Sequence, residues 1–219
     1  EAVHLFRAMC RVGFNVVFAG QVRSGKTTFL QTWQASEDPS LEGVAVATDP
    51  ETRWEAILPD APLMQLIADG DDLLAIEKSL KRSDADYVLL AALRAAASYR
   101  LFLGITSLGT MRSKGTIHDG SALNLPYKMA SAIASQLGGD RQAMIAQLFG
   151  SIHFVFAHMK LPENKAQKRL KALWEYRYDP AEDRVCAQQL CSYDPQTDSW
   201  RRAPAIGGDK LAIAAAYPG

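Results

Sequence analysis

Hydrophobic and polar positions in the first quarter of the chain follow two kinds of pattern. Residues 14–19 (FNVVFA) form a short run of apolar, β-branched and aromatic side chains, which is typical of a strand buried on both faces. After a loop that contains glycine, residues 27–33 carry apolar side chains at helical spacing, and residues 44–47 form a second short apolar run. The order strand, loop, helix, strand is that of a βαβ unit. We therefore predict an α/β fold in which helices flank a mostly parallel sheet.

The rest of the chain predicts further elements of the same kinds. The alanine- and leucine-rich residues 85–97 indicate a helix, whereas the apolar residues 100–104 (RLFLG) indicate another core strand. Residues 169–178 and 184–193 alternate apolar and polar side chains on either side of a turn, and so predict an antiparallel hairpin at the sheet edge. The other predictions, in chain order, are an irregular connection over 53–82, a strand over 112–118, helices over 125–137 and 141–149, and a strand over 151–157.

Length, charge and composition narrow the classes of protein. The 219 residues suit one domain over residues 1–200 followed by a short tail over residues 201–219. Because 24 basic side chains balance 24 acidic ones, no overall field attracts nucleic acid, and we expect no nucleic-acid partner. The three cysteines include no metal-binding pair, which argues against structural zinc and indicates a reducing compartment. No apolar run reaches the roughly 18–20 residues needed to cross a bilayer. We therefore expect a cytoplasmic protein that meets membranes through partners.

The loop between the first strand and the first helix carries the most informative motif. It matches GxxxxGK[ST] and is followed by Thr28, which completes the predicted nucleotide-binding set; the matching residues are Gly20, Gln21, Val22, Arg23, Ser24, Gly25, Lys26 and Thr27. Glycines let the backbone turn tightly, so that successive N–H groups and the helix N-terminus face phosphate oxygens. The sequence therefore predicts a site for ATP and Mg²⁺, in which Lys26 reaches the β- and γ-phosphates and the Thr27 hydroxyl binds the metal.

Polar residues also follow two other predicted strands. Asp49 and Glu51 come directly after the apolar run over residues 44–47, at the carboxyl edge where doubly wound sheets bind ligands. The same residues are equally good turn formers, since Thr48 and Pro50 accompany them. His118 ends the predicted strand over 112–118, where contact with a γ-phosphate and a purely structural role are the two interpretations. Asp49, Glu51 and His118 are thus the candidate catalytic residues.

The order of these features resembles the secretion ATPases, the hexameric motors of type II and type IV secretion, type IV pilus and conjugation systems. The features are the P-loop, the acidic turn, an Ala-Leu-Arg segment, an apolar strand ending in glycine, Thr-Ile-His at residues 116–118, a pair of helices and a terminal hairpin. The chain is most similar to the branch found in type IV secretion and tight-adherence pilus systems. The resemblance covers nearly the whole chain and corresponds to the C-terminal RecA-like motor domain; we expect the family's N-terminal domain to be absent.

The resemblance implies an activity, a site and partners. It implies a RecA-like P-loop ATPase that forms a homo-hexamer and works on inner-membrane components of a secretion or pilus machine. Carried onto this sequence, it gives Lys26 and Thr27 their roles on phosphate and Mg²⁺. It also places Asp49 and Glu51 in the family's acidic box and His118 in its histidine box.

The sequence departs from the family pattern at two places. Thr48 stands where the family has a first acidic residue. Residues 100–104 resemble the Walker B strand but are followed by Ile105 instead of a glutamate, and the loop and helix expected next are absent. We interpret this as a segment missing between Gly104 and Ile105 rather than as a lost acid.

The missing glutamate separates two functions. With it, the chain is an ATP-hydrolysing motor; without it, the chain is a nucleotide-binding switch or scaffold of the same fold with little hydrolysis. A small-molecule kinase is a third class, because the basic residues 160–171 resemble a lid that closes over phosphates. A solvated loop between strands is the interpretation that we prefer for those residues.

Overall fold

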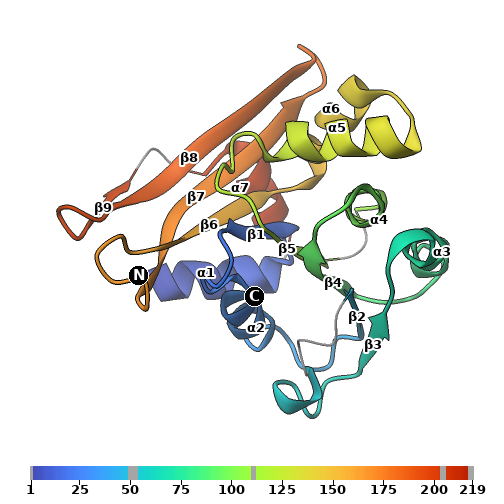
Figure 1. Ribbon diagram of the computed structural model, residues 1–219, viewed down its shortest axis with the longest axis horizontal. Coiled ribbons are helices and arrows are strands. Elements are labelled where there is room, and N and C mark those ends of the chain that lie inside the picture. Colours follow the sequence, from blue (N-terminus) through green and yellow to red (C-terminus); the bar gives the residue numbers. More distant parts are fainter. Residues whose placement is uncertain (1, 49–53, 110–111, 203–205, 217–219) are drawn as a thin grey trace.

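A nine-stranded sheet forms the centre of the computed structural model, which describes residues 2–48, 54–109, 112–202 and 206–216 (Figure 1). The strand order is β3-β2-β4-β5-β1-β6-β7-β8-β9. Strands from β3 to β6 in this order pair in parallel, and those from β6 to β9 pair antiparallel. The strands are β1 (Val16–Gly20), β2 (Gly43–Ala47), β3 (Leu63–Ile67), β4 (Tyr87–Leu93), β5 (Arg112–Ile117), β6 (Phe154–Lys160), β7 (Lys168–Asp179), β8 (Arg184–Asp194) and β9 (Ser199–Arg202). The predicted α/β fold with an antiparallel edge is confirmed.

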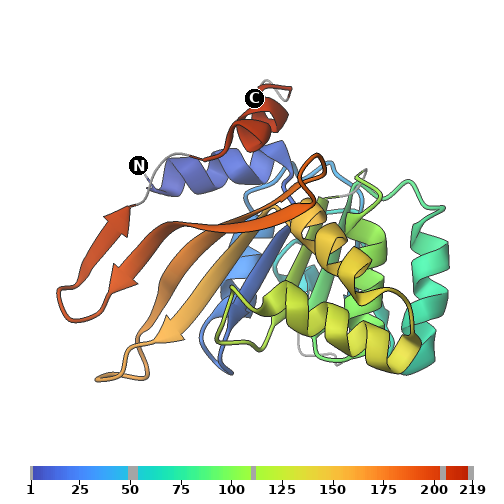
Figure 2. The same ribbon diagram turned by 90° about the horizontal axis from the view of Figure 1, so that it is seen from above.

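Helices cover both faces of this sheet (Figure 2). Side chains of α1, α2 and α7 pack on one face, and those of α3, α4, α5 and α6 pack on the other. The helices are α1 (Ala2–Val12), α2 (Lys26–Gln34), α3 (Gly70–Leu80), α4 (Ala96–Thr106), α5 (Leu125–Leu137), α6 (Arg141–Ser151) and α7 (Gly208–Ala215), with a short 3₁₀ turn over Trp54–Ala56. Among the described residues, no helix has the length and apolar character that a membrane span requires.

Strand β1 shows how the sequence divides the core in two. Val16 and Phe18 belong to the cluster beneath α1 and α2, whereas Val17 and Ala19 belong to the cluster beneath α4 to α6. Successive side chains of a strand point to opposite faces, and here both faces are covered. A strand in this position needs apolar side chains throughout, which is why residues 14–19 predict it correctly.

The predictions for residues 85–104 are wrong, because helix and strand are exchanged. Residues predicted as a helix form the interior strand β4, and RLFLG lies inside α4. A strand buried on both faces and a helix buried on most sides both read as unbroken apolar runs, so hydrophobic periodicity does not separate them. Leu101, Phe102, Leu103 and Ile105 are all buried, because α4 lies between the sheet and its neighbouring helices.

Helix α4 also corrects the prediction of a missing segment. Gly104 and Ile105 are consecutive residues of this helix, which continues to Thr106. Gly104 serves close packing, since a Cβ atom there would lie 2.3 Å from Oε1 of Glu77 on α3. The chain therefore lacks nothing between Gly104 and Ile105.

The irregular connection predicted over residues 53–82 is wrong as well, because it contains β3 and α3. The acidic cluster beside Gly70 opens α3, with Asp71 and Asp72 in its first turn. Carboxylates are favoured there because they face the positive end of the helix dipole. The polar cluster thus marks a helix start and not a loop.

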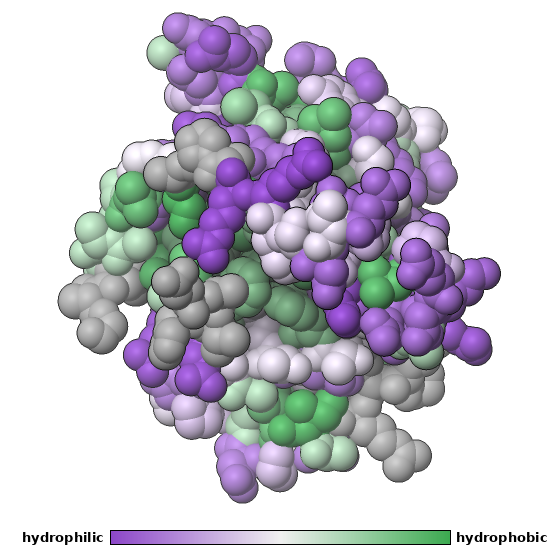
Figure 3. Space-filling view, turned by 90° about the vertical axis from the view of Figure 1, so that its left-hand side faces the viewer, coloured by the Kyte–Doolittle hydropathy of each residue, from purple (hydrophilic) through white to green (hydrophobic). Residues whose placement is uncertain are grey.

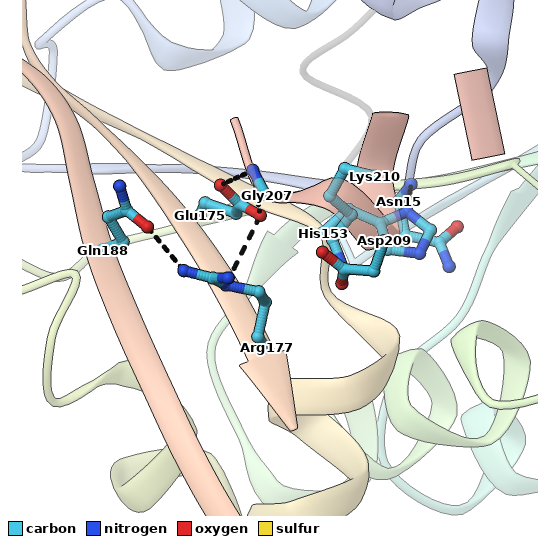
Figure 4. Close-up of polar contacts among 8 residues, drawn as sticks. All are labelled: Asn15, His153, Glu175, Arg177, Gln188, Gly207, Asp209 and Lys210. Carbon is cyan, nitrogen blue, oxygen red and sulfur yellow. Dashed lines mark hydrogen bonds and ion pairs between the residues drawn. The ribbon is translucent and has the colours of Figure 1, made fainter. Parts of the chain in front are cut away.

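A buried carboxylate holds α7 against the sheet (Figure 4). The Gly207 N–H donates to both carboxylate oxygens of Glu175 on β7, at 3.2 and 3.1 Å. Arg177 Nε lies 3.6 Å from Glu175 Oε1, and the Arg177 guanidinium donates to Gln188 on β8. These contacts fix the chain after β9 on the face that also carries α1.

Candidate nucleotide-binding site

The P-loop lies where the sequence predicts it, between β1 and α2. Gly25 is the N-cap of α2 in the left-handed conformation (φ +94°), and no side chain caps this helix. The first N–H groups of α2 therefore remain open to an anion. Gly20 ends β1 against β6, where an added Cβ would lie 2.6 Å from the carbonyl oxygen of His158. Both motif glycines are thus required by backbone geometry.

A pocket of about 450 Å³ opens over this loop. It lies at the carboxyl ends of β2, β4 and β5, next to the start of α2, which is the edge where doubly wound sheets bind ligands. Its lining residues are Val22, Arg23, Ser24, Gly25, Lys26, Thr27, Thr28, Thr48, Ala91, Ala92, Arg94, Thr116, His118 and Lys168. Gln21 is exposed beside the pocket but is not among them. The described lining residues include several cations and no carboxylate, so the pocket suits a polyanion.

The Lys26 ammonium makes three polar contacts in the site. Its ammonium donates to the carbonyl oxygens of Gly20 (2.9 Å) and Gln21 (2.7 Å), and lies 3.1 Å from Nδ1 of His118. Because a lysine ammonium has only donors, His118 Nδ1 is the acceptor when the charged Lys26 makes this contact. Burial, with the positive charge of Lys160 as the second cause, lowers the pKa of Lys26 to about 8. An incoming phosphate therefore meets an ammonium that already binds the loop and His118.

Two observations show groups in this site that suit a bound phosphate. The buried Ser24 hydroxyl lines the pocket and has no hydrogen-bond partner among the described residues. The uncapped start of α2 and the ammonium of Lys26 face the same space. Bound anions satisfy such groups at helix N-termini.

The donors for Mg²⁺ are fewer but compatible with how this ion binds. The exposed Thr27 hydroxyl lines the pocket. No cluster of three or more His, Cys, Asp or Glu side chains able to hold a metal occurs in the described parts of the chain. Mg²⁺ commonly keeps several waters and takes its other ligands from substrate phosphates and one or two protein groups. Thr27 is therefore the protein ligand that the described residues offer.

The two acidic candidates, Asp49 and Glu51, lie outside the described residues. Thr48, immediately before them, lines the pocket with a buried hydroxyl that lacks a partner among the described residues. Thr48, the last described residue before them, therefore lies at the pocket.

Sequence reasoning missed the contribution of β4. This strand, one place removed from β1 in the sheet, ends at the pocket with Ala91, Ala92 and Arg94. Ala92 has a left-handed backbone (φ +64°), and its N–H donates to the Thr116 hydroxyl of β5 at 2.8 Å. The glutamate that the family resemblance leads us to expect after residues 100–104 would thus belong at the end of β4. Residues 91–95, at that end, include no acidic side chain. The signal that could have revealed the contribution of β4 is the apolar run over residues 87–93, had it been assigned to a strand.

Comparison with solved structures finds proteins of similar fold. The VirB11 ATPase of the Brucella suis type IV secretion system, solved with sulphate, matches 80% of this chain and 52% of its own, with TM-score 0.69 and 19% identity. The Legionella pneumophila ATPase DotB matches 98% and 53%, with TM-score 0.58 and 12% identity. The pilus retraction motor PilT with bound ADP matches 70% and 46%, with TM-score 0.51 and 12% identity.

These likenesses define the fold of the chain. No family model and no curated protein matches the sequence. The chain spans about half the length of the solved proteins it is similar to. Its structural neighbours are secretion and pilus ATPases, and the RecA-like fold expected from the sequence resemblance is confirmed.

Proposed function

We propose that this chain is the ATP-binding and ATP-hydrolysing motor domain of a secretion, conjugation or pilus-assembly machine, with residues 1–200 as the motor domain. The observation that carries the proposal is the P-loop between β1 and α2, which opens into a cationic pocket. The fold shared with VirB11, DotB and PilT supports the motor class.

The proposed roles follow the contacts of the site. Lys26, the Ser24 hydroxyl and the N–H groups at the start of α2 bind the phosphates, and Thr27 binds Mg²⁺, whose charge supports phosphoryl transfer. His118, in contact with Lys26, responds to the γ-phosphate. Asp49 and Glu51 supply the carboxylates that position water and accept its proton.

A second candidate function is a nucleotide-binding switch or scaffold with little hydrolysis. The specific observation that favours it is that the described residues lining the pocket include no carboxylate, and that β4 contributes Ala91 and Ala92 to this lining. Hydrolysis then depends entirely on Asp49 and Glu51.

One comparison separates the two candidates: ATP affinity and steady-state turnover of the wild type, Lys26→Ala and Glu51→Gln. Glu55→Gln is a matched control, because Glu55 is an exposed carboxylate four residues further on. The motor proposal expects Glu51→Gln to slow turnover by about 10²–10⁴-fold while the control stays at the wild-type rate. Wild type that binds ATP but turns it over no faster than Lys26→Ala establishes the switch. Wild type that binds no ATP refutes both.

We also propose that the chain assembles as a homo-hexamer in the cytoplasm, attached to inner-membrane components of its machine. Strand β3 is a sheet edge that leaves Met64 60% and Ile67 59% exposed. An apolar edge of this kind is suited to cover by a neighbouring subunit. Turnover per chain should then rise with protein concentration, in parallel with ring formation observed by light scattering. Constant turnover from a stable monomer contradicts the ring.

A further inference from the structure

The turn between β6 and β7 lies at the phosphate edge of the sheet. Strand β6 runs parallel to β1, so its last residue, Lys160, reaches the same edge as the P-loop. Strand β7 runs back antiparallel, so its first residue, Lys168, lies at that edge beside Lys160. Figure 3 views the side of the molecule that carries this turn, where hydrophilic side chains cover much of the surface. The basic segment over residues 160–171 is therefore brought to the nucleotide pocket by topology.

Lys168 reaches the P-loop directly. It lines the pocket, and its Cδ would lie 3.3 Å from a Cβ atom added at Gly25. The aliphatic stem thus passes over the residue that caps α2, while the side chain is exposed to solvent. Within the described residues, the Lys168 ammonium forms no ion pair, so its charge is available to a ligand.

The charged side chains that line this pocket within the described residues are all basic. Lys26 and Arg23 line it together with Lys168, and Lys160 is close enough to Lys26 to disfavour its charged form. Like charges held together destabilise each other unless an anion lies among them. No carboxylate of the described lining residues supplies that anion. A ligand with several negative charges is what this arrangement accommodates.

We propose that Lys168 is a phosphate-binding residue of the nucleotide site, through which a bound nucleotide ties the β6–β7 turn to the P-loop. The inference rests on the proposed function, because it assumes that the P-loop binds a nucleotide. It adds a contact from the antiparallel edge of the sheet, whereas the motif itself supplies contacts only from β1 and α2. Nucleotide occupancy thereby restrains β7.

The test compares Lys168→Ala with Lys165→Ala, which removes an exposed lysine of the same turn that does not line the pocket. Affinities for ATP and for adenosine are measured on each folded variant, with Lys26→Ala as the reference for loss of the P-loop contact. Lys168→Ala should weaken ATP binding by about five- to tenfold, as expected for one partly exposed charged contact. Its adenosine affinity should be unchanged, and Lys165→Ala should match wild type for both ligands.

Hydrogen exchange provides an independent readout of the restraint. ATP should slow amide exchange in residues 160–170 of wild type and Lys165→Ala, but not of Lys168→Ala. Wild-type ATP affinity in Lys168→Ala, beside lost binding in Lys26→Ala, overturns this inference and leaves the proposed function standing. An equal loss of ATP and adenosine affinity also overturns it, because the contact is then not with phosphate. Absence of ATP binding by the wild type overturns both proposals.

Discussion

Substitution of Lys26 by methionine tests the centre of the site, because methionine keeps an apolar stem and removes the charge. A phosphate oxygen about 4 Å from the ammonium gains roughly 4 kcal/mol at an effective dielectric constant of about 20. When ATP binds, the Lys26 ammonium gives up its hydrogen bond to His118, which contributes a net free energy of about 1 kcal/mol. The difference of about 3 kcal/mol corresponds to an ATP affinity about 100-fold weaker, since 1.4 kcal/mol is tenfold.

The same substitution should leave the domain folded. Lys26 is only 5% exposed and binds the carbonyl oxygens of Gly20 and Gln21, so it contributes more to the loop than the motif alone indicates. Losing these two hydrogen bonds costs about 1 kcal/mol each. Removing a buried ammonium close to Lys160 offsets part of that cost. The free energy of unfolding should therefore fall by less than about 2 kcal/mol.

Titration with fluorescent ATP measures the first effect, and urea unfolding followed by circular dichroism measures the second. Thr32→Val is a suitable control, because Thr32 is an exposed residue of the same helix whose hydroxyl bonds to the Thr28 carbonyl. It should bind ATP as wild type does. A folded Lys26→Met variant that binds ATP within threefold of wild type would refute the assignment of the phosphate site.

Three further results are expected. His118→Ala should lower ATP turnover much more than ATP affinity, because His118 contacts the side chain of Lys26, which binds the loop carbonyls itself; equal turnover in both proteins makes His118 a structural residue. ATP affinity should fall about twofold between pH 7 and the Lys26 pKa of about 8, and more steeply above it, because binding favours the charged ammonium that higher pH removes; a flat calorimetric profile to pH 9.5 contradicts this. Lys114→Met should reduce the urea-derived stability by about 3–5 kcal/mol by leaving the buried Glu37 charge alone, and Lys114→Met/Glu37→Gln should recover much of it; a loss below about 1 kcal/mol in the single variant contradicts the pair's importance.

The sequence predicts the local features of the site well, but it predicts poorly which distant segments meet at the pocket. Strand β1, the P-loop and α2 are consecutive, so pattern and motif identify them together. Alternating side chains likewise identify β7 and β8, because each strand has two unlike faces. The exchange of helix and strand over residues 85–104 shows the limit. An apolar run records burial but not the element that buries it, and only the neighbours of β4 and α4 resolve the ambiguity.

Pocket residues from distant segments were missed for a different reason. Arg94, Thr116 and Lys168 lie in segments that the sequence singles out, but no short-range pattern places these side chains beside the P-loop, which they reach through the strand order. Strand β5 lies between β1 and β4, which brings their carboxyl ends to one pocket. Lys168 arrives only because β7 reverses direction. None of these pairings has a short-range signal in the sequence.

Both contacts proposed to respond to the nucleotide lead to the same strand. Lys168 is the first residue of β7, and Tyr176 of β7 donates its buried hydroxyl to the carbonyl of Ala122, in the loop that follows His118. That loop is joined to α5 by an ion pair of 2.9 Å between Asp119 and Lys128. Strand β5 cannot shift alone, because β1 and β4 pair with it on both sides. The loop after His118 therefore connects it to α5 and to β7, and β7 is the element on which the proposed phosphate contact of Lys168 acts as well.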